Sequence, residues 1–301
     1  MDIKFERAAH EAMATPFEVF IAATEPTLAR QAANAAFAEI DRIEQALSRY
    51  VQSSDISRIN HLAKGQATPV SECTFECLKA AARVHRETGG AFDVTIGPLM
   101  ACWRDKDESL RQPGEEELAA ARARVGMNLI ELDEAEQTVR VKVSGVQVDL
   151  GGIGKGYAVD QAAVFLEEWG IEAALVSAGG STVRAMDAPP GAPGWPVGVG
   201  GVGNQPHAPH ELELCNKALS GSGVHVRGRH IMDPRTGRPT RGKVATWALC
   251  PTATVADALS TAFMVMTPEE VEAYCRKHLD TSAMLVLEGD IDQERRRFGE
   301  W

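Results

Sequence analysis

The sequence predicts an α+β fold with mixed or antiparallel sheets and flanking helices. Segments with the two-residue period of strands and segments with the 3.6-residue period of helices both occur along the 301 residues. They neither alternate regularly, as in a chain of βαβ units, nor reduce to strands alone. Hydrophobic residues make up 44% of the chain, which is ample for a packed core.

Periodicity and turn residues place the elements of the first half. Alternation predicts a strand at 17–23, and apolar residues three and four apart predict a long helix at 26–49. Further helices are expected at 71–87, before a Gly-Gly pair, and at 115–124, after Pro-Gly. Short strands are then expected at 128–132, 138–143 and 146–150.

The second half begins with a glycine-rich turn that leads into a helix predicted at 157–169. A strand at 173–177 ends before another Gly-Gly pair, and the Pro and Gly residues of 188–203 indicate a loop or a hairpin. The remaining pattern predicts a strand at 244–249, helices at 254–266 and 268–278, and a strand at 283–287.

Charge and composition exclude several classes of partner. The formal net charge of -11 and the pI near 5.3 mean that nucleic acid and anionic membranes would be repelled, so neither is expected to bind. The N-terminal segment has neither the apolar core of a signal peptide nor the length of a membrane span, so we expect a cytoplasmic protein. The six scattered cysteines lack a close CxxC pair and are expected to be free thiols.

Glycines and a lysine gather between Val148 and Ala158, where the sequence is Val-Asp-Leu-Gly-Gly-Ile-Gly-Lys-Gly-Tyr-Ala. Backbone N–H groups in such a turn can point at a phosphate, and the following helix terminus adds partial positive charge. The spacing is neither that of a Walker loop nor GxGxxG. A tight turn that needs glycine for positive φ is an equally good explanation.

The helix predicted at 254–266 carries a polar side. Asp257 and Thr261 lie one turn apart among small residues, opposite an apolar stripe, so a bulky ligand could approach this side closely. A carboxylate, a neighbouring hydroxyl and a backbone carbonyl would suit a hard cation such as Mg²⁺. Alternatively, Thr254 and Asp257 form a helix-capping arrangement.

Other segments admit a functional and a structural interpretation. His230 precedes an Asp-Pro turn and could titrate near neutral pH, although a lone histidine is more often structural. Phe92 could stack on a planar ring while Asp93 accepts hydrogen bonds, or Phe92 is core and Asp93 caps a helix. Residues 48–50 and 54–60 are expected to end one helix and cap the next.

Taken in order, these segments resemble the ApbE family of FAD:protein FMN transferases across nearly the whole chain. The resemblance lies in Met13-Ala-Thr15, Ser48 to Asn60, Gly90-Ala-Phe-Asp93 through Leu99, Val148 to Ala158, Ala178-Gly-Gly180, His230 to Gly237 and Ala256-Asp-Ala-Leu-Ser-Thr261. It implies a single α+β domain over residues 1–301, with two lobes and FAD in the cleft between them.

The resemblance also implies the site residues. FAD contacts are implied for Met13, Tyr50, Ala91, Phe92, Asp93, Asp149, Lys155 and Ile231. Mg²⁺ contacts are implied for the Gly152 carbonyl, Asp257 and Thr261, with Ser260 as a further candidate. His230 matches a histidine with a role in transfer and is our candidate for the base, with a metal-side carboxylate such as Asp257 as the alternative.

The implied activity is Mg²⁺-dependent transfer of FMN from FAD to a threonine or serine hydroxyl of an acceptor flavoprotein, with release of AMP. The cation, Lys155 and the glycine backbone would neutralise charge on the diphosphate. Two alternatives remain, an FAD pyrophosphatase in which water replaces the acceptor, and a non-catalytic flavin-binding protein. The chain departs from the family pattern at Ala14, where glycine is usual, and at Ser181 and Leu219, which bear on contacts to the adenosine.

Overall fold

The structure is a computed structural model that describes residues 4–23, 25–105, 109–199, 210–224, 231–289 and 295–301. Its centre is an eight-stranded sheet in which all neighbouring strands are antiparallel. In spatial order the strands are β1 (Lys4–Ala12), β2 (Thr15–Ala23), β6 (Ala174–Ala178), β7 (Thr182–Ala185), β10 (Lys217–Gly223), β13 (Lys243–Cys250), β14 (Ser282–Leu287) and β15 (Arg295–Phe298).

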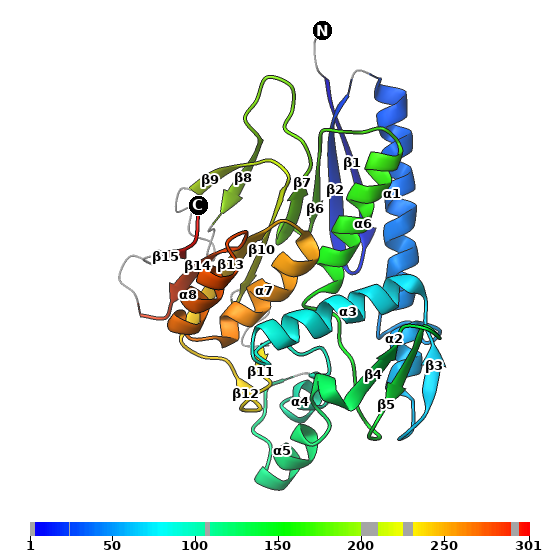
Figure 1. Cartoon of the computed structure of the whole chain (residues 1–301), viewed down its shortest axis with the longest axis vertical. Helices are drawn as coiled ribbons and strands as arrows, with labels where there is room; N and C mark the ends of the chain where they lie inside the picture. The colour runs from blue at the N-terminus through cyan, green and yellow to red at the C-terminus, as the bar shows by residue number, and fades with distance from the viewer. Residues whose placement is uncertain (1–3, 24, 106–108, 200–209, 225–230, 290–294) are drawn as a thin grey trace.

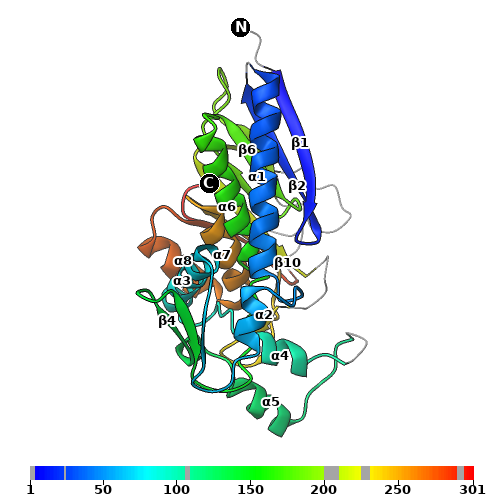
Figure 2. The same ribbon diagram turned by 90° about the vertical axis from the view of Figure 1, so that its right-hand side faces the viewer.

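Long helices pack on one face of this sheet (Figures 1 and 2). They are α1 (Pro26–Leu47) on β1 and β2, α6 (Gly154–Glu168) on β6 and β7, α7 (Ala253–Val265) on β10 and β13, and α8 (Pro268–Lys277) on β14 and β15. A hairpin of β8 (Trp195–Val199) and β9 (His210–Leu214) contributes Trp195 and Leu214 to a separate apolar cluster with Leu219 and Leu249. Alternate residues of the strands therefore enter two different apolar clusters.

The lower part of the molecule in Figure 1 carries the remaining elements. They are α2 (Asp55–Asn60), α3 (Glu72–Glu87), α4 (Gly97–Cys102), α5 (Glu115–Arg122), the 3₁₀ helix η1 (Met127–Leu129), the sheet of β3 (Ala67–Pro69), β5 (Thr138–Val141) and β4 (Ile130–Asp133), and the ribbon of β11 (Met232–Asp233) and β12 (Arg238–Pro239). The predicted α+β class with antiparallel sheets and flanking helices is thus confirmed.

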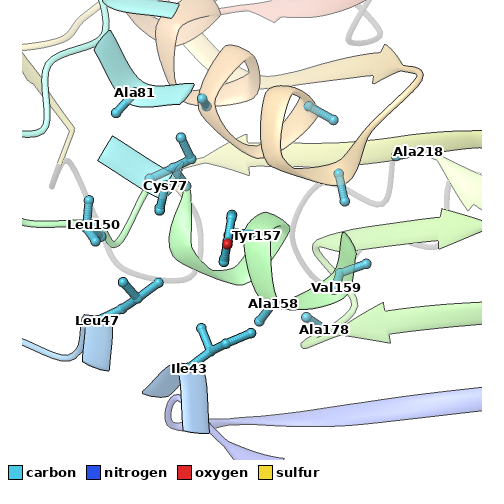
Figure 3. Close-up of a cluster of buried hydrophobic side chains, with 14 of the residues drawn as sticks. Ile43, Leu47, Cys77, Ala81, Leu150, Tyr157, Ala158, Val159, Ala178 and Ala218 are labelled. Atoms are coloured by element: carbon cyan, nitrogen blue, oxygen red, sulfur yellow. The ribbon is translucent and has the colours of Figure 1, made fainter. Parts of the chain in front are cut away.

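One apolar core joins α1, α3 and α6 to the sheet (Figure 3). Tyr157 of α6 lies between Ile43 and Leu47 of α1 on one side and Cys77 of α3 on the other. Small residues such as Ala158 occur at these contacts and let the helices approach closely. Since α6 begins inside the glycine-rich segment, the core also fixes the position of that segment.

Two predictions about local structure need correction. Helix α6 begins at Gly154 instead of residue 157, so Lys155 and Gly156 belong to its first turn and not to a loop. Residues 146–150 do not form a strand, and only Gln147 makes a bridge, to Ile96. The reason is that the Asn60 side chain binds both backbone groups of Val148, at 2.6 and 3.0 Å, and so replaces a neighbouring strand.

Other ends shift by a few residues. The helix predicted at 115–124 ends at Arg122, and the strand predicted at 128–132 begins only at Ile130, after η1. The stretch 188–203, interpreted as a loop or a hairpin, contains β8, which pairs in antiparallel fashion with β9. Ser54 caps α2 as expected, because its side chain accepts a hydrogen bond from the Ser57 amide at 2.9 Å.

The helices and cysteines can be compared with the expectations from composition. Within the described ranges, none of the helices has the length and apolar character needed to cross a membrane. All six cysteines are free, as expected, and five of them are buried. The cytoplasmic location stays a prediction.

Candidate active site

The first turn of α6 lies directly against the start of α7, and Gly156 is the point of contact. A Cβ atom built on Gly156 would lie 2.2 Å from the Ala253 carbonyl oxygen and 2.8 Å from the Asp257 Cβ. No side chain fits there without a shift of α7 backbone. None of the glycines at 151, 152, 154 and 156 has positive φ, so the interpretation of this segment as a positive-φ turn is wrong. Glycine serves the close approach of two helices here.

Asp257 points from α7 toward the start of α6 and is only 3% exposed. Its Oδ2 accepts a hydrogen bond from the Gly156 amide at 3.0 Å. Its Oδ1 has longer contacts with the Ser220 hydroxyl at 3.3 Å, the Thr182 hydroxyl at 3.4 Å and Lys155 Nζ at 3.5 Å. Asp257 thus joins the lysine and the glycine segment to the sheet.

The capping alternative for Thr254 and Asp257 is wrong. The N-cap of α7 is Thr252, and its side chain makes no capping hydrogen bond. Thr254 donates its hydroxyl to Asp160 of α6, at 2.5 Å, and not to Asp257. Asp257 therefore does not act at the terminus of its own helix.

The oxygens around Asp257 fit a magnesium ion. Every donor to Asp257 Oδ1 lies at 3.3 Å or more, beyond the usual hydrogen-bond distance, so this atom keeps capacity for a cation. Gly152 lies against Thr261, since a Cβ on Gly152 would be 3.1 Å from Thr261 Oγ1. Among the described residues no group of three or more His, Cys, Asp or Glu side chains could hold a metal. One carboxylate with neutral oxygens is a set that Mg²⁺ completes with water and phosphate.

Ser260 is the weakest of the predicted metal ligands. Its hydroxyl donates to the Asp257 carbonyl at 2.9 Å and lies 2.8 Å from the Ser222 hydroxyl, and the residue is fully buried. The first contact is within α7 and the second reaches β10, so both contacts of this hydroxyl are made inside the protein. Thr261 is only partly buried, and its contacts with Ser222 Oγ and the Asp257 carbonyl are long, at 3.4 Å each.

The outer rim of the junction is formed by Tyr50, Arg49 and Asp149. Asp149 accepts a hydrogen bond from the Gly151 amide at 2.7 Å and pairs with Arg49 at 3.0 Å. The Arg49 guanidinium lies 4.8 Å from the Tyr50 ring centroid, and Tyr50 is 82% exposed. An exposed aromatic ring beside a backbone loop can stack on a planar ligand, as predicted for the flavin.

Ala91, Phe92 and Asp93 lie inside the protein against the glycine segment, and all are at most 6% exposed. Phe92 Cε2 would be 3.3 Å from a Cβ on Gly152. Asp93 accepts hydrogen bonds from the Thr95 amide and hydroxyl, at 2.8 and 2.6 Å, and from the Met127 amide at 3.2 Å. Asp93 orders this loop and does not cap α4, whose N-cap is Ile96. Contacts of these three residues with FAD stay predictions.

His85 holds the same loop and should make stability depend on pH. Its Nδ1 lies 2.9 Å from the Phe92 carbonyl oxygen and 3.3 Å from Asp93 Oδ2. The hydrogen bond with Asp93 raises the pKa of His85 above its usual 6.5, against the opposing effect of burial. Because the pKa is higher in the folded state, this stabilisation is complete below pH 6.5 and is lost as the pH rises through the folded-state pKa.

We therefore expect the stability difference between wild type and His85→Asn to shrink as the pH rises above about 6.5. Asparagine offers an amide N–H near the position of Nδ1 but cannot titrate. The comparison therefore measures the contribution of the positive charge on His85. Urea unfolding of both proteins from pH 5.5 to 8.5 measures the difference. A gap that is constant or grows with pH would contradict the proposed pairing.

Met13 lies at the tip of the β1–β2 hairpin, where Met13 and Ala14 have φ of 50° and 56°. Ala14 therefore occupies a left-handed conformation that favours glycine. The tip lies against the β6–β7 turn, since a Cβ on Gly179 would be 2.2 Å from Thr15 Oγ1. Met13 is thus brought to the end of the sheet where β7 begins with Thr182, an Asp257 contact.

The two other departures from the family pattern differ in position. Leu219 is 5% exposed and packs in the cluster with Trp195, whereas its neighbour Ser220 contacts Asp257. Because successive strand residues point to opposite faces, Leu219 is directed away from the junction. Ser181 lies in the β6–β7 turn, where its carbonyl accepts a hydrogen bond from the Gly221 amide at 2.8 Å.

The structure does not place every predicted residue at the junction. His230 lies outside the described residues, and Ile231 is buried, with its carbonyl bonded to the Thr240 amide at 2.9 Å. The described chain has a cavity of about 490 Å³ between α1, α3, α6 and the start of α7, and one of about 290 Å³ beside the C-terminal end of α6. Neither is lined by the predicted flavin or metal residues, so the FAD cleft stays a prediction.

Several polar groups at the junction were not predicted from the sequence. Thr182 and Ser220 contact Asp257, and Asp160 contacts the start of α7. Alternation in Ser220-Gly-Ser222 was the available signal for two hydroxyls on one face of a strand. Asp160, one turn after Gly156, shares a helix side with it, but nothing local shows what it would meet.

Solved structures place this fold in the structural class of the flavin transferases. The chain aligns with the flavinyl transferase ApbE of Pseudomonas stutzeri in its apo form at a TM-score of 0.87 and 26% identity, covering 99% of this chain and 96% of that one. The flavin transferase ApbE from Vibrio cholerae aligns at a TM-score of 0.83 and 26% identity, covering 98% and 97%.

Sequence comparison identifies the family. Curated proteins called FAD:protein FMN transferase from Klebsiella pneumoniae (strain 342) and Escherichia coli (strain K12) are 32% and 31% identical over 269 and 267 residues. Each alignment covers 84% of this chain and 76% of the relative. The ApbE family profile matches residues 13–285. The chain belongs to the ApbE family.

Proposed function

We propose that this chain is a Mg²⁺-dependent FAD:protein FMN transferase. It moves FMN from FAD onto a threonine or serine of an acceptor flavoprotein and releases AMP. The observation that carries the proposal is the α6–α7 junction, where the Asp257 carboxylate meets the Gly156 amide at 3.0 Å and Lys155 Nζ at 3.5 Å. The named activity of the Klebsiella and Escherichia relatives supports it.

The junction gathers the charges that cleavage of a diphosphate requires. Asp257 and Thr261, with the carbonyl of Gly152, would hold Mg²⁺, which when bound withdraws charge from phosphate oxygens. Lys155 and the first backbone amides of α6 add positive potential at the same place, because the N-terminus of a helix attracts anions. Tyr50, on the exposed rim, would orient the flavin ring.

The transfer step is a displacement at phosphorus. The acceptor oxygen bonds to the FMN-side phosphorus, and the bond from that phosphorus to the bridging oxygen breaks, so AMP leaves with this oxygen. The hydroxyl proton passes to a base, for which His230 is our candidate and Asp257 the alternative.

A second candidate function, hydrolysis of FAD to FMN and AMP, uses the same residues with water as the acceptor. The exposed rim supports hydrolysis as a candidate, since Tyr50 is 82% exposed and Gly151 is also exposed. Water therefore reaches the start of the glycine segment.

One experiment separates the candidate functions. The protein is incubated with FAD and Mg²⁺, with and without an acceptor flavoprotein, while AMP is measured by chromatography and the acceptor by mass spectrometry. A transferase should release AMP at least about tenfold faster with acceptor and add FMN to it, and a chelator should stop both. Full-speed AMP release without acceptor would show a pyrophosphatase, and FAD binding without AMP release would show a flavin-binding protein.

A further inference from the structure

The start of α7 is capped by an aspartate from another helix. Asp160 of α6 accepts hydrogen bonds from the Ala253 amide at 2.9 Å, the Thr254 amide at 2.8 Å and the Thr254 hydroxyl at 2.5 Å. These amides have no partner inside α7, and its own N-cap residue does not satisfy them. Asp160 is 6% exposed and lies at the edge of the cavity of about 490 Å³ between α1, α3, α6 and the start of α7.

The two helices cap each other reciprocally. Asp257 of α7 accepts from the Gly156 amide in the first turn of α6, while Asp160 of α6 accepts from the first amides of α7. Ala253 is held from both sides, because its amide binds Asp160 while its carbonyl oxygen fills the space that a Gly156 side chain would need. A movement of α7 relative to α6 would therefore break hydrogen bonds at both aspartates.

Strand β7 ties the two aspartates together. Arg184 pairs with Asp160 at 2.6 Å, and Thr182 contacts Asp257 Oδ1 at 3.4 Å. Thr182 and Arg184 are two residues apart and so lie on the same face of the strand. The buried charge of Asp160 is thereby balanced by an arginine whose strand also touches the metal-side carboxylate.

We propose that Asp160 is a positioning residue for metal binding, which sets the place of Asp257 relative to the glycine segment. The inference rests on the proposed function for its catalytic consequence. Groups that hydrogen-bond a metal ligand from behind typically change metal affinity or activity by about 10-fold to 100-fold when they are lost. Asp160 acts on Asp257 one step further away, through the amides of Ala253 and Thr254, so we expect an effect at the lower end of this range. A residue that only stabilised the fold would leave metal affinity unchanged.

Asp55 provides a matched control. It belongs to α2 and caps the start of α3, accepting from the Ser71 amide at 2.8 Å and from the Ser71 and Thr74 hydroxyls at 2.6 and 2.7 Å. It also pairs with an arginine, Arg58, and is 7% exposed. Asp55→Asn therefore weakens the same kind of interhelical cap, since an amide keeps one acceptor oxygen and loses the charge, at a helix that carries none of the proposed metal ligands.

The experiment compares wild type, Asp160→Asn and Asp55→Asn by thermal unfolding, by Mn²⁺ binding without FAD, and by the Mg²⁺ and FAD dependence of AMP release. We expect both variants to melt at lower temperature. In Asp160→Asn alone, the Mn²⁺ dissociation constant and the half-saturating Mg²⁺ concentration should rise about tenfold, while KM for FAD changes less than about twofold. If Asp160→Asn is insoluble, Arg184→Gln should weaken Mn²⁺ binding, because it removes the charge partner of Asp160.

Specific results would overturn the inference. The first is an Asp160→Asn protein that melts at lower temperature but binds Mn²⁺ as tightly as wild type. The second is a loss of Mn²⁺ affinity in Asp55→Asn equal to that in Asp160→Asn. The third, where Asp160→Asn is insoluble, is a soluble Arg184→Gln protein with the Mn²⁺ affinity of wild type. Because Mn²⁺ binding needs no turnover, the proposed function is judged separately. A wild type that binds Mn²⁺ through Asp257 but releases no AMP would contradict the transferase and leave the test of Asp160 intact.

Discussion

Asp257→Asn is expected to lower the rate of Mg²⁺-dependent FMN transfer by at least about 100-fold, because it removes the single carboxylate from the proposed metal site. An amide oxygen is a poorer ligand for a hard cation and brings no charge to balance it. Thr261 and Gly152 offer only neutral oxygens. Raising the Mg²⁺ concentration should therefore recover only a small part of the rate.

The fold of this variant should survive. The side-chain oxygen of asparagine can still accept the hydrogen bond that the Gly156 amide gives to Asp257 at 3.0 Å, and the volume is unchanged. Urea unfolding should stay within about 1 kcal/mol of wild type, so the loss of rate is chemical and not structural. Asp257→Glu keeps the charge but displaces it, and should lose less metal affinity than Asp257→Asn. Unchanged AMP release in Asp257→Asn would remove Asp257 from the site.

The sequence predicted the elements whose signals are local. Helix α1 and helix α8 have amphipathic patterns, and α8 begins with a capping box formed by Thr267 and Glu270. Strand β1 was missed because its charged residues obscure the alternation, which is common for a strand at the edge of a sheet. Strands β7 and β10 were missed because Ser, Gly and Thr give little apolar period.

The site was predictable in its residue types and not in its contacts. Lys155 and Asp257 were singled out from their segments, and the structure places Lys155 Nζ 3.5 Å from Asp257 Oδ1. Asp160 was missed because its partners, Ala253 and Thr254, lie 93 and 94 residues away. Gly156 was interpreted as part of a loop, since no local pattern shows that a second helix occupies the space of its side chain.

Gly156→Ala is the second change with a large expected effect, and two opposing terms decide its sign. Inside a helix, alanine is favoured over glycine by about 1 kcal/mol. Against this, the new Cβ would lie 2.2 Å from the Ala253 carbonyl oxygen, which belongs to backbone and cannot rotate away. Overpacking of this kind costs about 1–3 kcal/mol and sometimes more, so we expect net destabilisation of up to about 2 kcal/mol and a melting temperature lower by up to roughly 3 °C.

Gly156→Ala should affect the rate of AMP release more strongly than the stability of the fold. Relief of the collision requires α7 to move away from α6, which lengthens the contact of Asp257 with the Gly156 amide and shifts the carboxylate from Lys155. A displacement near 1 Å at reacting groups can cost about 100-fold in rate, and AMP release at saturating Mg²⁺ measures it.

Gly154→Ala is the matched control for stability, because it lies in the same helix and its Cβ would meet only Leu150 Cβ at 3.7 Å, an ordinary contact. It should be as stable as wild type or more so, since only the propensity term acts. If Gly156→Ala behaves like Gly154→Ala and retains full activity, the packing of α6 on α7 accommodates the added methyl group. The contact between α6 and α7 would then not determine the position of the Asp257 carboxylate. The proposed dependence of activity on the packing of α6 on α7 would be contradicted.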